Sequence, residues 1–334
     1  MKNSMMSVAE AAEKISSGAF CVIAGSEAAL SQLPKGNWIG GTSVYFVTEE
    51  GGKVDRENVF VTEVADATAA KIKHYGPEAL PTLAADRFDT GLSMILIPAF
   101  SKAHTAFAID GSCYDGLFDQ PLMGWITGIH LDDLGKASQK VFDGTTGEMH
   151  EEGAVLMHLE LPAGQVADLD IVNLFEQDKS ADAITFSKDG FSAEKAYVNG
   201  EEVDFAAYVT EKGLNTQMPL VADYAGAMIN VSFQNVDAEA GRVDFYAPVI
   251  EGVEYRLAKP QGDYAATFQS RVAGLDGGNE LSCNCILNYL YGELEGKRTG
   301  DFTGPATFGE VAYILLNQTM VRMNVKSAEA SQVA

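Results

Sequence analysis

The sequence lacks any apolar run long enough to cross a membrane as a helix. Its most apolar window, residues 94–97, is ended by Pro98 and followed by polar residues, whereas a membrane-spanning helix needs about 20 consecutive apolar residues. The first eighteen residues contain acidic side chains and no long apolar stretch, unlike a secretory leader. We therefore expect a cytoplasmic protein that does not insert into a membrane.

Positive charge is also scarce. Lys and Arg number 23 against 47 Asp and Glu, which gives a formal net charge of −24. Proteins that bind nucleic acids neutralise phosphates with Lys and Arg, so this balance argues against a nucleic-acid partner and against an anionic membrane surface. A high net charge of either sign keeps a protein soluble, and solubility is the simplest reading of the acidity.

Cysteine is too rare for a disulfide framework. The four residues, Cys21, Cys113, Cys283 and Cys285, are spread over a chain of 334, which is long enough to bury a core without disulfides or metals. The Cys-x-Cys pair has no second pair to complete a zinc site, and the five histidines have no metal-ligand spacing. We therefore expect free thiols and no metal site.

Two histidines have informative surroundings. His104 lies between two apolar segments that both read as strands, 92–97 and 106–109, so it could line a pocket. His158 lies opposite the apolar face of an alternating segment, 154–161, and is expected to face solvent.

The remaining pattern alternates helices and strands. Ser7 and Glu10 form a capping box that predicts a helix start. An apolar run of strand length follows at 19–24, and 38–47 reads as strand, glycine turn and strand. This order is typical of α/β units.

Beyond residue 183 the strands become short and are punctuated by turn signals, including Asn199-Gly200. A chain of this length suggests two domains. We expect an α/β (α+β) fold with two mixed-sheet domains of related size packed together and helices on the outer faces. The expected domains are residues 1–185 and 186–326, followed by a tail at 327–334.

Three segments could build a site. The first is the glycine turn Gly40-Gly41-Thr42-Ser43, whose backbone N–H groups could cradle a small anion, although a bare structural turn remains open. It matches neither a P-loop nor a dinucleotide fingerprint.

The second segment, 281–285, looks like the end of a strand that runs into a helix. Free N–H groups and the helix dipole at such a junction lower the pKa of a thiol, so Cys283 could be a nucleophile. The alternative is that Cys283 and Cys285 are small buried packing residues.

The third segment is the turn that contains Phe308, Gly309 and Glu310. Gly309 allows a ligand or a backbone to approach closely. Glu310 could bind an amine or act as a general base. Alternatively, it could form a structural salt bridge or be an exposed strand residue.

The chain also carries an ordered set of segments that together resemble a known family. They are 38–43 (WIGGTS), 183–188 (AITFSK), 196–208 (AYVNGEEVDFAAY), 249–257 (VIEGVEYRL), 281–285 (LSCNC) and 300–317, with Phe302, Gly309, Glu310, Asn317 and Gln318 in place. In this order they resemble the FIST family of intracellular sensory proteins, which have an N-terminal and a C-terminal FIST domain. Many members have an arginine shortly after the cysteine, as Cys-x-x-Arg; here Cys285, Ile286 and Leu287 occupy that region.

The resemblance implies recognition of a small ligand, often suggested to be an amino acid, and some members of the family are haem-containing nitric-oxide sensors. The sequence shows no fused kinase, cyclase, chemoreceptor or F-box segment, so we expect signalling to pass through a separate signalling protein or to rest on binding alone.

We therefore expect a stand-alone sensory protein of the FIST N and FIST C type, not an enzyme, with a ligand between the two domains. The expected ligand-binding residues are Gly40, Gly41, Thr42, Ser43, Cys283, Asn284, Cys285, Phe308, Gly309 and Glu310, with Glu310 pairing with an ammonium group. Two alternatives remain open: an enzyme or redox sensor that uses Cys283, and a haem-based gas sensor. Apart from that last case we expect no cofactor.

Overall fold

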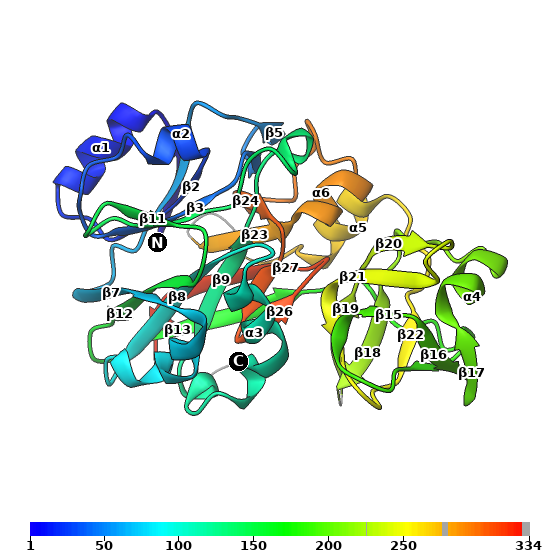
Figure 1. Cartoon of the computed structure of the whole chain (residues 1–334). Coiled ribbons are helices and arrows are strands. Elements are labelled where there is room, and N and C mark those ends of the chain that lie inside the picture. The colour runs from blue at the N-terminus through cyan, green and yellow to red at the C-terminus, as the bar shows by residue number, and fades with distance from the viewer. Residues whose placement is uncertain (225, 276–279, 329–334) are drawn as a thin grey trace.

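A computed structural model describes residues 1–224, 226–275 and 280–328 (Figure 1). These residues form a larger body and a smaller lobe, which appears at the right of Figure 1 in green and yellow. Mixed sheets dominate and short helices cover them, which confirms the expected α/β (α+β) class.

The first sheet of the body has the strand order β1-β6-β2-β3-β10-β11. Its strands are β1 (Lys2–Met6), β2 (Cys21–Gly25), β3 (Trp38–Thr42), β6 (Val59–Glu63), β10 (Val141–Asp143) and β11 (Glu148–His150). Helices α1 (Val8–Ser16) and α2 (Glu27–Leu30) pack against it. The predicted capping box is present at the start of α1, where Ser7 and Glu10 bond reciprocally.

The second sheet has the order β26-β25-β9-β8-β12-β7. Its strands are β7 (Ala69–Tyr75), β8 (Gly91–Pro98), β9 (Leu122–Thr127), β12 (Ala154–Glu160), β25 (Glu310–Ala312) and β26 (Ile314–Leu316). Strands β8 and β9 are parallel. The connection between them contains α3 (Lys102–Asp110), η2 (Gly111–Cys113) and η3 (Leu117–Asp119). The 3-10 segment η1 (Pro77–Asp86) packs against α3.

The third sheet has the order β13-β27-β23-β24-β4-β5. Its strands are β4 (Tyr45–Thr48), β5 (Gly51–Val54), β13 (Gln165–Val172), β23 (Leu281–Cys285), β24 (Gly304–Thr307) and β27 (Met320–Ser327). Helices α5 (Tyr264–Arg271) and α6 (Ile286–Tyr291) share a core with this sheet. The short η4 (Leu131–Asp133) lies between β9 and β10 in the chain.

The lobe consists of a six-stranded and a three-stranded sheet with their own core, in which Phe186, Phe205 and Phe245 contact one another. The larger sheet contains β17 (Glu201–Asp204), β16 (Lys195–Val198), β14 (Ile184–Thr185), β22 (Tyr255–Leu257), β18 (Leu220–Tyr224) and β19 (Ala227–Val231). The smaller contains β15 (Gly190–Ala193), β21 (Arg242–Val249) and β20 (Phe233–Asp237), and α4 (Phe205–Glu211) covers both.

The sheets do not divide the chain at the expected boundary of 185/186. Strand β24 pairs with β4, β25 pairs with β9, and β27 pairs with β13, so the end of the chain returns to the sheets of the first half. The lobe is an insertion between β13 and α5, and it is smaller than the body. A sequence pattern locates a strand but not its partner, which explains the error.

The expected tail begins at Ser327, which still belongs to β27, and residues 329–334 lie outside the described part.

The segment 106–109, expected to be a strand, is part of α3. An apolar run this short fits either a helix or a strand, because periodicity cannot separate the two over four residues. His104 therefore lies in the first turn of a helix that follows the carboxyl end of β8.

Candidate functional site

The glycine segment Gly40 to Ser43 is not an open cradle. Gly40, Gly41 and Thr42 belong to β3, which has a strand on each side. The N–H of Thr42 donates to the carbonyl of Lys140 at 3.0 Å, and the N–H of Ser43 donates to the carbonyl of Gly25 at 2.9 Å. The sheet uses these donors, so the anion-binding interpretation is wrong.

The three predicted segments nevertheless meet inside the body. Ser43 Oγ donates to the carbonyl of Ala306 in β24, Cys283 Sγ lies 3.5 Å from the carbonyl of Gly124 in β9, and Glu310 pairs with Trp125 in the same strand. All ten predicted residues except Phe308 are buried. The meeting point is thus core, where a ligand would have to displace side chains.

Glu310 is the most perturbed carboxyl of this core. Complete burial raises its pKa to about 8, although hydrogen bonds from Thr319 favour the charged form. Its Oε2 accepts the Thr319 hydroxyl at 2.8 Å and the Thr319 N–H at 3.2 Å. A carboxyl with this pKa is mostly protonated at neutral pH, so it does not supply the anion that was expected to pair with an ammonium group.

The cysteines of β23 do not have the expected lowered pKa. Burial and the neighbouring Glu310 raise the pKa of both the Cys283 and the Cys285 thiol well above its ordinary value. Cys283 lies within the strand, and the helix that follows has only six residues, Ile286–Tyr291. Both residues belong to hydrophobic cores of the body, in agreement with the packing interpretation and not with a nucleophile.

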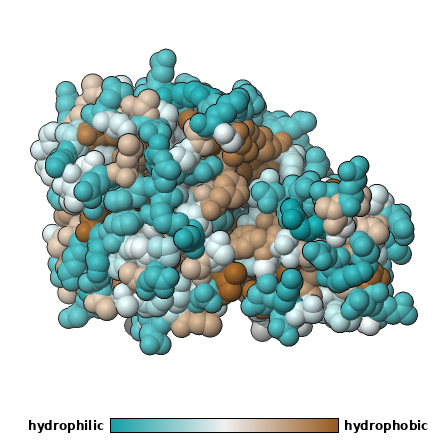
Figure 2. All heavy atoms as spheres, in the orientation of Figure 1, coloured by the Kyte–Doolittle hydropathy of each residue, from teal (hydrophilic) through white to brown (hydrophobic). Residues whose placement is uncertain are grey.

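A cavity of about 360 Å³ lies where the lobe meets the body. The body contributes Ala99, Phe100, His104, Thr105 and Phe308. The lobe contributes Phe191, Gln234, Phe245 and Tyr246. Hydrophobic residues mark this junction on the surface (Figure 2).

The turn before α3 places His104 in the wall of this cavity. Ser101 caps the helix, because its Oγ accepts the His104 N–H at 3.0 Å. Phe100 adopts a left-handed backbone conformation, with φ of 63°. Its backbone N–H donates to Nδ1 of His104, with 3.2 Å between the two nitrogen atoms. Nδ1 is therefore an acceptor, and the proton of the neutral ring resides on Nε2.

Nε2 of His104 is buried and has no hydrogen-bond partner among the described residues. Burial lowers the pKa of this imidazole to about 4, so the ring is neutral at physiological pH and Nε2 is a donor without an acceptor. The ring of Phe191 from the lobe packs against it, with centroids 5.6 Å apart and planes at 65°. Buried donors are normally paired, so this one marks a place where a ligand atom would fit.

The N-terminus of α3 is already occupied by a carboxylate of the protein. Glu152 Oε2 accepts the N–H of Lys102 and its Oε1 accepts the N–H of Ala103, each at 2.9 Å. The site therefore does not offer these helix N–H groups to an anionic ligand.

Other hollows differ from this cavity in their chemistry. One of about 510 Å³ includes Glu10 and Lys53, and a second of the same size includes Glu176 and Lys259. Charged side chains line both hollows, whereas small-molecule sites are lined mainly by apolar and aromatic side chains, so these surfaces match a small organic ligand less well.

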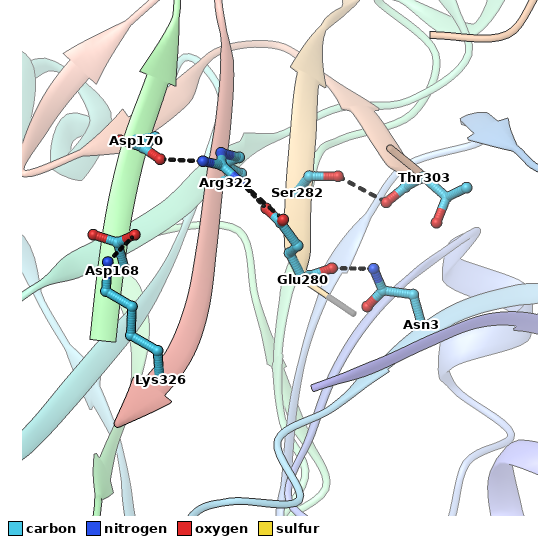
Figure 3. A network of polar contacts seen from close by, with 8 residues as sticks. All are labelled: Asn3, Asp168, Asp170, Glu280, Ser282, Thr303, Arg322 and Lys326. Carbon is cyan, nitrogen blue, oxygen red and sulfur yellow. Dashed lines mark hydrogen bonds and ion pairs between the residues drawn. The ribbon is translucent and has the colours of Figure 1, made fainter. Parts of the chain in front are cut away.

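A network of ion pairs fixes the third sheet (Figure 3). Arg322 on β27 pairs with Asp170 on β13 and, at 2.8 Å, with Glu280 beside β23. Lys326 pairs with Asp168 at 2.8 Å across the same two strands. These charged groups are paired with one another across neighbouring strands of the sheet.

Sequence reasoning placed Phe308 in the site and allowed a pocket for His104, but it missed Phe100 and the lobe residues. No short motif marks Phe191 or Tyr246. His158, expected to face solvent, is 1% exposed and bonded to Ser93 Oγ and the Tyr75 hydroxyl.

Within residues 1–224, 226–275 and 280–328, no three His, Cys, Asp or Glu side chains are grouped so that they could hold a metal ion. No helix in the same ranges has the length and apolar character to span a membrane.

Comparison with known proteins gives one family match. The model of DUF6976, described as a family of unknown function, matches residues 6–326. Comparison with curated proteins gives no match.

Proposed function

We propose that this chain, which belongs to the DUF6976 family, is a binding protein that holds a small molecule in the cavity between its body and its lobe. The observation that carries the proposal is the unpaired, buried Nε2–H of His104 in the wall of a cavity lined mainly by aromatic rings. A concave, largely apolar surface with a few polar groups is typical of small-molecule sites. The position at the carboxyl end of the parallel strands β8 and β9 is also where α/β proteins often bind ligands.

The lining favours binding over catalysis. Among the nine lining residues the ionisable side chains are His104 and Tyr246. The pKa of His104, about 4, leaves the imidazole too weakly basic to take a proton at neutral pH. The cavity wall therefore holds no nucleophile activated by a base.

A sensory role follows from which parts of the protein the ligand would touch. The body and the lobe each supply part of the wall, so a bound molecule would favour the arrangement in which the two are closed around it. A separate signalling protein could read that arrangement. This role agrees with the FIST resemblance, which itself stays a prediction.

The two alternative functions have less support. A Cys283-dependent enzyme would need a reactive thiolate, and burial raises the pKa of that thiol. A haem sensor would need an axial histidine. His104 is the histidine in the cavity. Its Nδ1 accepts the Phe100 N–H, so the proton of the neutral ring is on Nε2, and Nε2 in this tautomer has no lone pair to offer iron.

A thermal-shift screen with chemically diverse small molecules tests the proposal. The useful variant is Thr105→Phe, which places a ring at the exposed rim of the cavity. Thr82→Phe is its matched control, because Thr82 is also exposed and its hydroxyl bonds a carbonyl of the preceding turn, as that of Thr105 does.

We expect compounds that stabilise the native chain and Thr82→Phe but not Thr105→Phe. A ligand at 100 times its Kd adds about 2.7 kcal/mol to the free energy of unfolding, a shift that the screen detects easily. The proposal fails if no compound stabilises the protein, or if every hit stabilises Thr105→Phe equally.

A further inference from the structure

We infer that the ligand is a neutral, flat, ring-bearing molecule with a hydrogen-bond acceptor that receives the Nε2–H of His104. This inference rests on the proposed function, because it concerns the same cavity. It goes further by stating the charge, the shape and the one polar atom of the molecule. Each of these comes from a different property of the wall.

The shape follows from the rings. Five of the nine lining residues are phenylalanine or tyrosine, and His104 adds an imidazole ring. Phe100 and Phe308 stand edge to face with centroids 6.4 Å apart and planes at 66°, and His104 and Phe191 stand at 65°. Walls of this kind offer faces for stacking and edges for T-shaped contacts, both of which favour a flat ring. The volume of about 360 Å³ is at the lower end of ligand sites, which suits one or two fused rings.

The acceptor follows from His104. Its Nδ1 receives the Phe100 N–H, so the ring cannot change tautomer without losing that bond. The Nε2–H is left as a fixed donor without a partner among the residues described. A ring nitrogen or a carbonyl oxygen on the ligand would satisfy this donor.

The neutral charge follows from what surrounds the cavity. Gln234 and Thr105 supply the polar groups of the rim, and none of the nine lining side chains carries a formal charge at neutral pH. An anion would find the N-terminus of α3 already bonded to Glu152. An amino acid would leave its carboxylate and its ammonium group without partners, and burying an unpaired charge is costly.

A quaternary ammonium ion is the strongest competitor. The net charge of −24 attracts cations, and aromatic faces bind them. The Nε2–H of His104 argues against such a ligand, because a cation would meet the positive end of a buried N–H dipole.

Isosteric probes separate these classes. Quinoline carries one acceptor nitrogen and naphthalene carries none, while benzyltrimethylammonium and phenylalanine represent the cation and the amino acid. Binding of each probe to the full chain is measured by fluorescence and NMR at pH 7.5. We expect quinoline to bind at least about tenfold more tightly than naphthalene, because only quinoline pairs the buried donor.

The variant His104→Phe should make the two neutral probes bind equally, whereas His130→Phe, a substitution at a half-buried histidine elsewhere in the body, should preserve the difference. A direct readout needs no variant: quinoline should shift the ¹⁵N resonance of His104 Nε2 while naphthalene does not. This measurement keeps the test valid if His104→Phe does not fold.

Three outcomes overturn the inference. Equal binding of quinoline and naphthalene to the native chain would show that the ligand needs no hydrogen-bond acceptor. The proposed function survives this result if Thr105→Phe prevents the binding of both probes. Binding of only benzyltrimethylammonium or phenylalanine, again blocked by Thr105→Phe, replaces the ligand class and leaves the function intact. If no probe binds and the diverse screen also gives no hit, the proposed function falls together with the inference.

Discussion

The backbone N–H of Ser232 in the lobe donates to Oδ1 of Asn317 in the body at 3.0 Å. Asn317 completes the contact from its other side, because its Nδ2 donates to the carbonyl of Asn230 at 3.1 Å. Ser232, Asn230 and Asn317 are all buried. One amide side chain thus satisfies a donor and an acceptor of the lobe where the lobe meets the body.

Replacement of Asn317 by alanine should destabilise the protein by about 1–3 kcal/mol, because it leaves the Ser232 N–H and the Asn230 carbonyl buried without partners. Urea unfolding measures the loss, and hydrogen exchange should show faster exchange at Ser232. The exposed Asn235 on β20 provides the control as Asn235→Ala. Equal stability of Asn317→Ala and the native chain would contradict this account of the junction.

Glu310 should make the stability of the protein fall as the pH rises. Its pKa is raised by burial from 4.5 to about 8, so the unfolded chain releases this proton above pH 4.5 while the folded chain retains it up to about pH 8. The stabilisation by the protonated group is complete below pH 4.5 and is lost as the pH passes through 8.

The variant Glu310→Gln cannot ionise and should therefore become more stable relative to the native chain between pH 5 and pH 8.5, by an amount on the order of a few kcal/mol. Urea unfolding at the two pH values measures the difference. Glu50→Gln, at an exposed position, should show no such trend. A pH-independent difference for Glu310→Gln would show that this carboxyl ionises normally in the folded state.

His104 should make the stability of the protein fall as the pH decreases, which is opposite to the effect of Glu310. Burial lowers its pKa from 6.5 to about 4, so the unfolded chain takes up a proton below pH 6.5 while the folded chain does not. The contribution of the neutral ring is complete above pH 6.5 and is lost as the pH falls toward 4. Between pH 7 and pH 5 the native chain should lose roughly 2 kcal/mol more than His104→Phe. NMR titration gives an independent check, since the His104 ring should not titrate above pH 5.

The cysteines should differ sharply in reactivity. Cys113 is exposed, whereas Cys21, Cys283 and Cys285 are buried, and burial raises the pKa of all three buried thiols. A thiol reagent should therefore modify one cysteine of the native protein and all four after unfolding. The variant Cys113→Ser should not react in the native state. Fast modification of Cys283 in this variant would revive the cysteine-dependent alternative.

Local features were predictable because they depend on neighbouring residues. The capping box of Ser7 and Glu10, the buried strand that became β2 and the strand-to-helix step at Cys285 are all present. The Asn199-Gly200 turn joins β16 to β17, with both residues at positive φ as a tight hairpin requires. Each of these features is decided by side chains within a few residues of one another.

The site was predicted only in part. Phe308 and, more weakly, His104 were identified from their segments, but the glycines and cysteines that looked most distinctive are core residues. A glycine that allows neighbouring strands to pack closely cannot be distinguished in a sequence from a glycine that allows a ligand to approach the backbone. For Gly41 the space is filled by Thr127 and Trp125 of β9, which no local pattern reveals.

The sequence by itself determined the net charge, the absence of long apolar runs, the α/β class and most of the local turns and caps, because these depend on residue type and short-range spacing. Only the tertiary structure decided that the lobe is an insertion, that Phe191 packs against His104 and that Tyr246 lines the same cavity. It also decided that Glu310 is a core residue whose pKa is raised by burial. The physical reason is that pairing between distant strands and the pKa of a buried group depend on which residues come together in space, and that information is distributed over the whole chain.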